Sequence, residues 1–124
     1  MRNRLLKWTI LAVWLVGLNA VTGFAQTALI PRGAVWKYLD HGSNPGVAWK
    51  EPAFDDAAWK SAPARLGYGG DGEKSVVGFG PDPNRKYATT YFRVAFDVAN
   101  PAVFPSLTLS LLRDDGAVVY LNGT

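Results

Sequence analysis

The sequence of 124 residues contains no cysteine and only one histidine. Without cysteine the chain has no disulfides, no thiolate metal ligands, no thiol nucleophile and no cysteine for lipid attachment. The lone His41 cannot build a multi-histidine metal site, and no serine stands in the Gly-x-Ser-x-Gly pattern of many hydrolases. Heptads, long amphipathic helices and internal repeats are also missing. These absences predict a non-catalytic domain that is held together by its apolar core alone.

The first 25 residues have the three parts of a secretory signal peptide. Residues 1–7 are basic, residues 8–18 are almost entirely apolar, and the segment ends in Gly23-Phe24-Ala25. This order predicts a signal-peptide helix, cleavage between Ala25 and Gln26, and a secreted, periplasmic or cell-surface protein. The segment also has the nominal length of a retained membrane anchor, an alternative that its polar interruptions disfavour.

Charge is balanced once the predicted signal is set aside. The chain has 13 lysines and arginines and 10 acids, and three of the basic residues lie within residues 1–7. Residues 26–124 therefore carry ten charges of each sign. A nucleic-acid-binding surface needs an excess of basic side chains, so the sequence predicts no nucleic-acid partner, and contact with a membrane only through the export signal.

The remaining 99 residues suggest one domain of short strands and long loops. Residues 26–33 contain Pro31 and Gly33 and are typical of a linker, and the aromatic and branched residues 34–39 predict a strand. Residues 54–59 predict one helical turn capped by Asp55. Residues 67–85 are rich in glycine and proline and predict a long irregular loop.

Alternating apolar residues predict three further strands in the second half. The strand at 90–98 is the clearest, and shorter ones are expected at 107–111 and 117–121. Asn122-Gly123 is a strong hairpin signal, but only Thr124 follows it, so we expect the last strand to lack its partner. The pattern as a whole predicts an all-β sandwich or jelly roll that is incomplete at its C-terminal end.

Several local motifs together resemble galactose-binding-like jelly-roll modules of exported bacterial proteins. Such modules accompany calcineurin-like phosphoesterases, spore-coat-kinase-like proteins, lamin-tail proteins and glycoside hydrolases. The resemblance covers residues 34–124 and implies an eight-stranded sandwich that serves a separate catalytic domain. It is carried by Trp36-Lys37-Tyr38-Leu39-Asp40, Pro45-Gly46, Trp49, Phe54-Asp55-Asp56, Trp59, Ala64-Arg65-Leu66-Gly67-Tyr68-Gly69 and the segment from Asp114 to Gly123.

Aromatic residues in or beside the loops are the candidate carbohydrate-binding side chains. A ring in a loop can present its flat face to a sugar, and neighbouring polar groups can bind the hydroxyls. Trp49, Tyr68 and Tyr87 are the candidate rings, with Asp71 and Arg85 as polar partners. The competing interpretation is that these rings fill the core. No cofactor is expected, although Asp71 and loop carbonyls offer oxygen ligands of the kind that calcium takes.

Three functions remain open from the sequence. The first is an accessory module that binds a glycan or another cell-surface polymer. The second is a spacer that orients a downstream domain of the same polypeptide and binds nothing. The third is the leading fragment of a secreted hydrolase, such as a calcineurin-like phosphoesterase, whose catalytic domain lies beyond Thr124.

Overall fold

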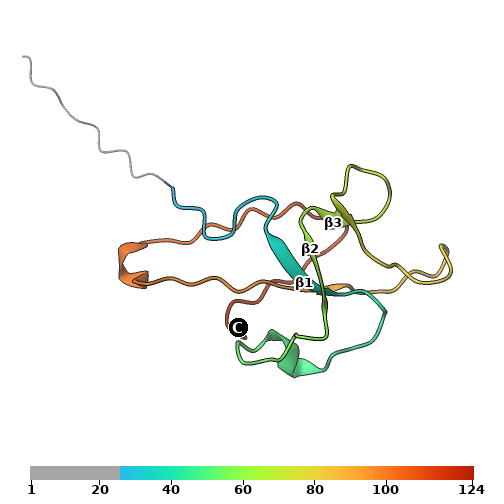
Figure 1. Ribbon diagram of the computed structural model, residues 1–124, viewed down its shortest axis with the longest axis horizontal. Helices are drawn as coiled ribbons and strands as arrows, with labels where there is room; N and C mark the ends of the chain where they lie inside the picture. Colours follow the sequence, from blue (N-terminus) through green and yellow to red (C-terminus); the bar gives the residue numbers. More distant parts are fainter. Residues whose placement is uncertain (1–25) are drawn as a thin grey trace, which may run out of the picture.

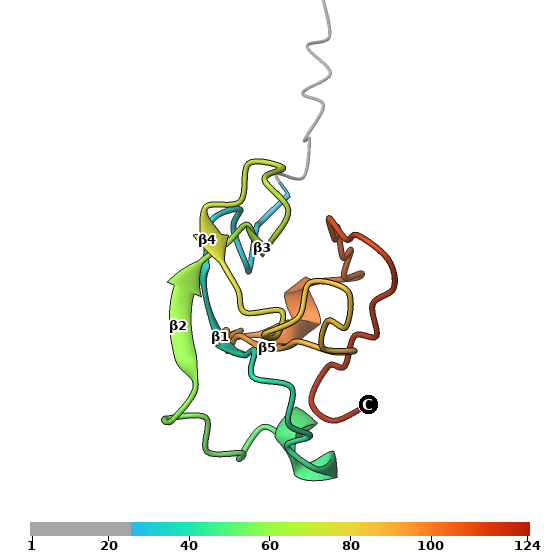
Figure 2. The same cartoon turned by 90° about the vertical axis from the view of Figure 1, so that its right-hand side faces the viewer.

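The computed structural model describes residues 26–124 as a β-rich fold with little helix (Figures 1 and 2). Strands contain 16% and helices 7% of the residues, as the sequence predicts for an all-β class. Both helices are single 3-10 turns, and none in this part of the chain is long and apolar enough to cross a membrane. The predicted signal-peptide helix, residues 1–25, lies outside the described residues.

A three-stranded antiparallel sheet forms the centre of the fold. Strand β1 (Val35–Leu39) lies between β2 (Lys60–Pro63) and β5 (Tyr91–Arg93). Tyr38 is opposite Lys60 on one side and Phe92 on the other. The branched and aromatic residues of β1 favour an extended backbone, so the predicted strand at 34–39 is confirmed.

A second, two-stranded sheet interrupts the stretch that was expected to be wholly irregular. Strands β3 (Leu66–Gly67) and β4 (Ser75–Val76) pair in parallel. The hydroxyl of Ser75 donates a hydrogen bond of 2.8 Å to the carbonyl of Pro63, which fastens the small sheet to the end of β2. Pairs of two residues are too short to leave a periodic pattern in the sequence.

The core is small and built around one tyrosine and one tryptophan. Tyr38 and Trp59 are both buried, together with Val77 from the segment after β4. Phe54 packs its ring against Trp59 in an edge-on arrangement with centroids 5.7 Å apart. Asp55 accepts from the backbone N–H of Ala57 as predicted, but residues 54–59 form a hydrogen-bonded turn instead of a helical turn.

One arginine connects the central sheet to the loop that follows β1. The Arg93 guanidinium, at the end of β5, pairs with the Asp56 carboxylate at 2.8 Å. It also donates to the carbonyls of Trp49, Glu51 (3.1 Å) and Phe54 (3.5 Å). We call this set of contacts the Arg93 clamp.

The clamp holds a segment with little regular structure. Trp49 belongs to the single-turn 3-10 helix η1 (Val47–Lys50), and the chain from Glu51 to Asp56 contains only a turn and irregular backbone. A guanidinium offers five donors in a fixed plane, so one side chain can satisfy several carbonyls at once. Figure 2 shows η1 below the central sheet.

The three strands expected in the second half are only partly formed. Of the strand predicted at 90–98, residues 91–93 pair as β5 and the rest is unpaired, while the strands predicted at 107–111 and 117–121 are absent among the described residues. A strand requires a neighbour that exchanges hydrogen bonds with it, and none of the described residues supplies one here. The predicted strand at 90–98 is therefore confirmed in part, and the strands predicted at 107–111 and 117–121 are wrong, although the backbone there is extended (Figure 1).

Turns in this half follow the prediction more closely. The short 3-10 helix η2 (Pro101–Val103) is capped by the Asn100 side chain, which accepts from the N–H of Ala102. Asn122 and Gly123 have φ angles of 51° and 87°, and Leu121 and Thr124 exchange two backbone hydrogen bonds across them. Positive φ at both central positions is the geometry of the tight hairpin turn that Asn-Gly predicts.

Replacing Arg93 by alanine should destabilise the fold more than replacing an exposed arginine. Arg93→Ala leaves Asp56 and three carbonyls without their donor, and the arginine side chain is only 16% exposed. We expect a loss of about 2–3 kcal/mol in the free energy of unfolding, measured by urea denaturation with tryptophan fluorescence.

A matched control is Arg32→Ala, because Arg32 is exposed and forms no hydrogen bond or ion pair with residues 26–124. Its effect should stay within about 0.5 kcal/mol. Arg93→Lys keeps the charge but loses the planar fork and should fall between the two. Equal stability of the Arg93→Ala and Arg32→Ala proteins would contradict the clamp.

Candidate functional site

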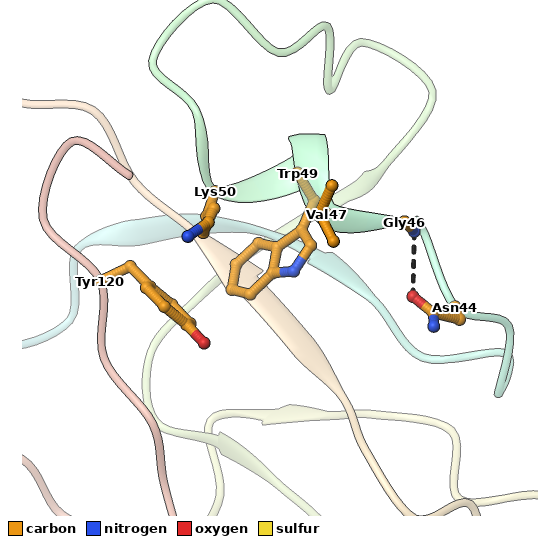
Figure 3. Close-up of a pocket in the computed structure, with 6 residues that line it drawn as sticks. All are labelled: Asn44, Gly46, Val47, Trp49, Lys50 and Tyr120. Carbon is orange, nitrogen blue, oxygen red and sulfur yellow. Dashed lines mark hydrogen bonds between the residues drawn. The ribbon is translucent and has the colours of Figure 1, made fainter. Parts of the chain in front are cut away.

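A hollow of about 300 Å³ opens beside η1 and is walled by two aromatic rings (Figure 3). One wall comes from the loop after β1 and from η1, and the opposite wall comes from the C-terminal segment. We call it the Trp49 pocket. Its lining residues are Asn44, Gly46, Val47, Trp49, Lys50 and Tyr120.

The rings of the Trp49 pocket are held edge to face. The Trp49 ring lies 5.2 Å from Tyr91 at an interplanar angle of 70°, and 5.7 Å from Tyr120 at 90°. The ammonium group of Lys50 lies 4.9 Å from the centroid of the Tyr120 ring. Edge-to-face pairs and a cation over a ring are both favourable, so these contacts hold the two walls at a fixed separation.

Polar groups stand at the rim of the same pocket. Asn44 accepts a hydrogen bond of 2.9 Å from the N–H of Gly46 through its side-chain oxygen. This bond orients the Asn44 amide, and its NH₂ group has no partner among residues 26–124. The Lys50 ammonium is the second polar group of the lining, and no carboxylate contributes to it. The pocket thus combines flat apolar faces with hydrogen-bond donors.

The two walls also meet where Gly123 lies against the side chain of Glu51. Gly123 is buried, and a Cβ atom added to it would lie 2.7 Å from Oε2 of Glu51. Glu51 directly follows Lys50, and Gly123 comes three residues after Tyr120. Since its φ is 87°, glycine is favoured here for its conformation, whereas the Glu51 carboxylate is the flexible end of its side chain and can move away from a Cβ atom.

A second and more open hollow, of about 640 Å³, lies on the side of β4. Tyr87 lines it and packs against two glycines: Cβ atoms added to Gly42 and Gly80 would lie 2.5 and 3.4 Å from its ring. We call it the Asp40 hollow. Its lining consists of Asp40, His41, Lys60, Val76, Val77, Gly78, Phe79, Gly80, Pro81 and Tyr87.

Asp40 is the only buried charged residue within 26–124, and its hydrogen bonds all go to one carboxylate oxygen, Oδ2. The Lys60 ammonium lies 2.8 Å from Oδ1 and 3.0 Å from Oδ2, with hydrogen-bond geometry satisfied only at Oδ2. The N–H of Gly78 also donates to Oδ2, at 2.6 Å. Burial alone would raise the pKa of Asp40, but the Lys60 and Gly78 hydrogen bonds outweigh it, so this pKa lies below its ordinary value.

The same contact also stabilises the charged form of Lys60. Its hydrogen bond to Asp40 raises the pKa of the ammonium group, although the side chain is 61% exposed. The register of β1 and β2 places Lys60 opposite Tyr38, two residues before Asp40. The pair therefore joins the end of β1 to the start of β2, and the Gly78 contact adds the segment after β4.

The structure places three of the five candidate binding residues at the two hollows and leaves the other two outside them. Trp49 lies in the Trp49 pocket, and Tyr87 lines the Asp40 hollow. Tyr68 stacks on Phe79 at 5.0 Å, and Phe79 also lines the Asp40 hollow, so Tyr68 and Tyr87 belong to one region. Asp71 and Arg85 are exposed in loops, and neither side chain lines one of the two hollows.

The candidate aromatic rings in the loops neither fill the core nor stand fully in solvent. Trp49 and Tyr87 are half-buried, with one part of each ring packed and another facing a hollow. Tyr68 is more exposed and lies under the Lys86 ammonium at 4.8 Å. Within residues 26–124 no group of three or more histidine, aspartate or glutamate side chains is placed to hold a metal ion.

Sequence reasoning missed the partners that complete both hollows. Tyr120 was placed in a predicted strand, and its approach to Trp49 depends on the path of the C-terminal segment. Asp40 ends a strand and gave no signal of burial, because its partner Lys60 is twenty residues away. Asn44 and Lys50 lie close to Trp49 in the sequence. Polar residues near a tryptophan in a loop were the one sequence signal that could have indicated the lining of the Trp49 pocket.

Comparisons with known proteins add no identification. The chain matches no protein family, no curated protein and no solved structure. The resemblance to galactose-binding-like modules therefore stays a prediction from the motifs, and the geometry of the described residues is the basis for the function proposed below.

The Asp40–Lys60 pair predicts how stability changes with pH. A carboxylate with a lowered pKa contributes stability above its ordinary pKa of about 3.9, and this contribution disappears as pH falls through the lower folded value. Lysine with a raised pKa contributes below about pH 10.4 and loses its contribution at higher pH. We therefore expect a plateau between about pH 5 and 9 and a decline on both sides.

Asp40→Asn keeps the shape and the Gly78 hydrogen bond but removes the ion pair. The variant should be less stable at pH 7 by about 1–3 kcal/mol and should show a weaker decline below pH 4 than the unaltered chain. Thermal unfolding followed at half-unit pH steps measures both effects. If the stability of both proteins falls equally at acid pH, the loss of stability arises from carboxylates other than Asp40.

Proposed function

We propose that this chain is a non-catalytic accessory module of an exported protein and that the Trp49 pocket binds carbohydrate. The observation that carries the proposal is the half-buried Trp49 ring, which faces a hollow between a second aromatic ring and two polar side chains. Sugars have apolar C–H faces and polar edges, so they match a site that combines rings with hydrogen-bond donors.

The roles within the pocket follow from the positions of its residues. Trp49 offers the stacking face, and Tyr120 stands perpendicular to it as a side wall. The Asn44 amide and the Lys50 ammonium donate to hydroxyl oxygens at the rim (Figure 3). Because the lining has one cation and no carboxylate, it suits neutral or acidic sugars.

The wider proposal includes the fold type and the destination of the protein. A galactose-binding-like jelly roll agrees with the β-rich fold and with the antiparallel central sheet. Export is supported by the basic, apolar and small-residue order of residues 1–25. In this proposal the partners are a glycan or cell-surface polymer and a further domain of the same polypeptide.

A glycan array followed by calorimetric titration tests the binding function. The probes are galactose, glucose, N-acetylglucosamine and their oligomers, together with uronic acids. Tyr120→Ala should weaken the strongest interaction by about tenfold, which corresponds to the loss of about 1.4 kcal/mol of ring contact. Trp49→Ala should abolish it.

Tyr68→Ala is the matched control for Tyr120→Ala. Each tyrosine is partly exposed and carries a lysine ammonium over its ring, at 4.8 Å for Lys86 and 4.9 Å for Lys50. The control should retain binding. Loss of binding in Tyr68→Ala alone would move the site to the Asp40 hollow, and a folded protein that binds no probe would refute the proposal and leave the spacer role.

A further inference from the structure

The segment from residue 105 to 112 is extended chain with no strand partner among residues 26–124, and it offers a free edge for pairing. It runs as extended chain across the molecule after η2 (Figure 1). Its backbone N–H and C=O groups form no backbone hydrogen bond with any part of residues 26–124. Such an edge is a template for pairing with another strand.

Its side chains give this edge an apolar face. Leu107, Leu109 and Leu111 are 62%, 60% and 50% exposed, and their spacing places all three on the same side of an extended backbone. Thr108 and Ser110 lie on the other side. No charged residue or proline stands between Ser106 and Leu112, although these are the usual means of protecting an edge from association.

The order of these residues reads the same in both directions around Leu109. Leucine flanks the segment at 107 and 111, and small hydroxyl residues occupy 108 and 110. In an antiparallel pair of two identical copies centred on Leu109, Leu107 is opposite Leu111 and Thr108 is opposite Ser110. Within 107–111 each cross-strand pair then joins residues of the same kind, whereas the next pair outward joins Ser106 to Leu112. Hydroxyl and apolar pairs across strands both stabilise a sheet.

We propose that residues 107–111 pair with the same residues of a second copy, in antiparallel register about Leu109. A two-fold axis through Leu109 makes the interface self-complementary, as in most homodimers. The absence of charge means that the pairing sets no like charges against each other. It would satisfy the unpaired backbone groups and bury leucines that a single chain leaves in water.

Cysteine placement tests the register without interference, because the chain has no cysteine of its own. In the proposed pair residue 109 is opposite itself at a Cα separation of about 4.5–5.5 Å, within disulfide range. Leu109→Cys should therefore form a disulfide-linked dimer under mild oxidation of the purified full chain. Thr108→Cys alone should not, since residue 108 is diagonal to its copy, about 7–8 Å away.

A mixture supplies the matching positive control. Thr108→Cys and Ser110→Cys chains carrying different tags should form the heterodimer in preference to either homodimer, because only these two positions are opposite. None of these substitutions removes a backbone hydrogen bond of the single chain, so the fold should persist. Similar disulfide yields at 108, 109 and 110 would overturn the register and the proposal.

Sedimentation of the full chain tests association itself. The unaltered chain should sediment as a dimer at tens of micromolar, and Ser110→Pro, which removes an edge N–H, should shift it to monomer. Association through residues 1–25 would be unaffected by Ser110→Pro, so an unchanged dimer overturns the proposal. A folded monomer whose backbone amides at 107–111 exchange freely with solvent hydrogen would also overturn the proposal. Any strand that pairs with this segment would then belong to a different polypeptide.

Discussion

Arg93 is the side chain on which the geometry of the Trp49 pocket depends. Its strand, β5, is paired with β1, and its guanidinium donates to one carbonyl of η1 and to two carbonyls and one carboxylate of the segment between η1 and β2. That segment has little regular structure, and the chain has no disulfide to fix it. The conformation of the loop is therefore set by the planar guanidinium of Arg93. Because Arg93 lies on a paired strand, its donors are held more rigidly than the loop residues are.

The Trp49 pocket inherits its order from this arrangement. The carbonyl of Trp49 is one of the groups that Arg93 binds, and the Trp49 ring packs on Tyr91, two residues before Arg93 on β5. The backbone and the ring of Trp49 are thus both held by residues of strand β5. For the proposed binding of carbohydrate this matters, because a ring that had to become ordered on binding would reduce the affinity.

How far the sequence predicts the structure depends on whether the signal is local. The strand at 34–39, the Asp55 side-chain cap and the Asn122-Gly123 turn need only neighbouring residues, and each is present. The strands expected at 107–111 and 117–121 need a partner strand, and alternation in sequence does not supply one. The Asp40–Lys60 pair and the approach of Tyr120 to Trp49 depend on chain paths, so no local pattern could have indicated them.

Gly123 offers a different kind of control over the same pocket. It lines no part of the hollow, and a Cβ atom added to it would meet the Glu51 carboxylate, which is the movable end of that side chain. The constraint on a larger residue lies instead in the backbone, because a φ of 87° strains any residue that carries a Cβ atom. A substitution at Gly123 would therefore alter the turn that follows Tyr120, and through that turn the position of one wall of the pocket.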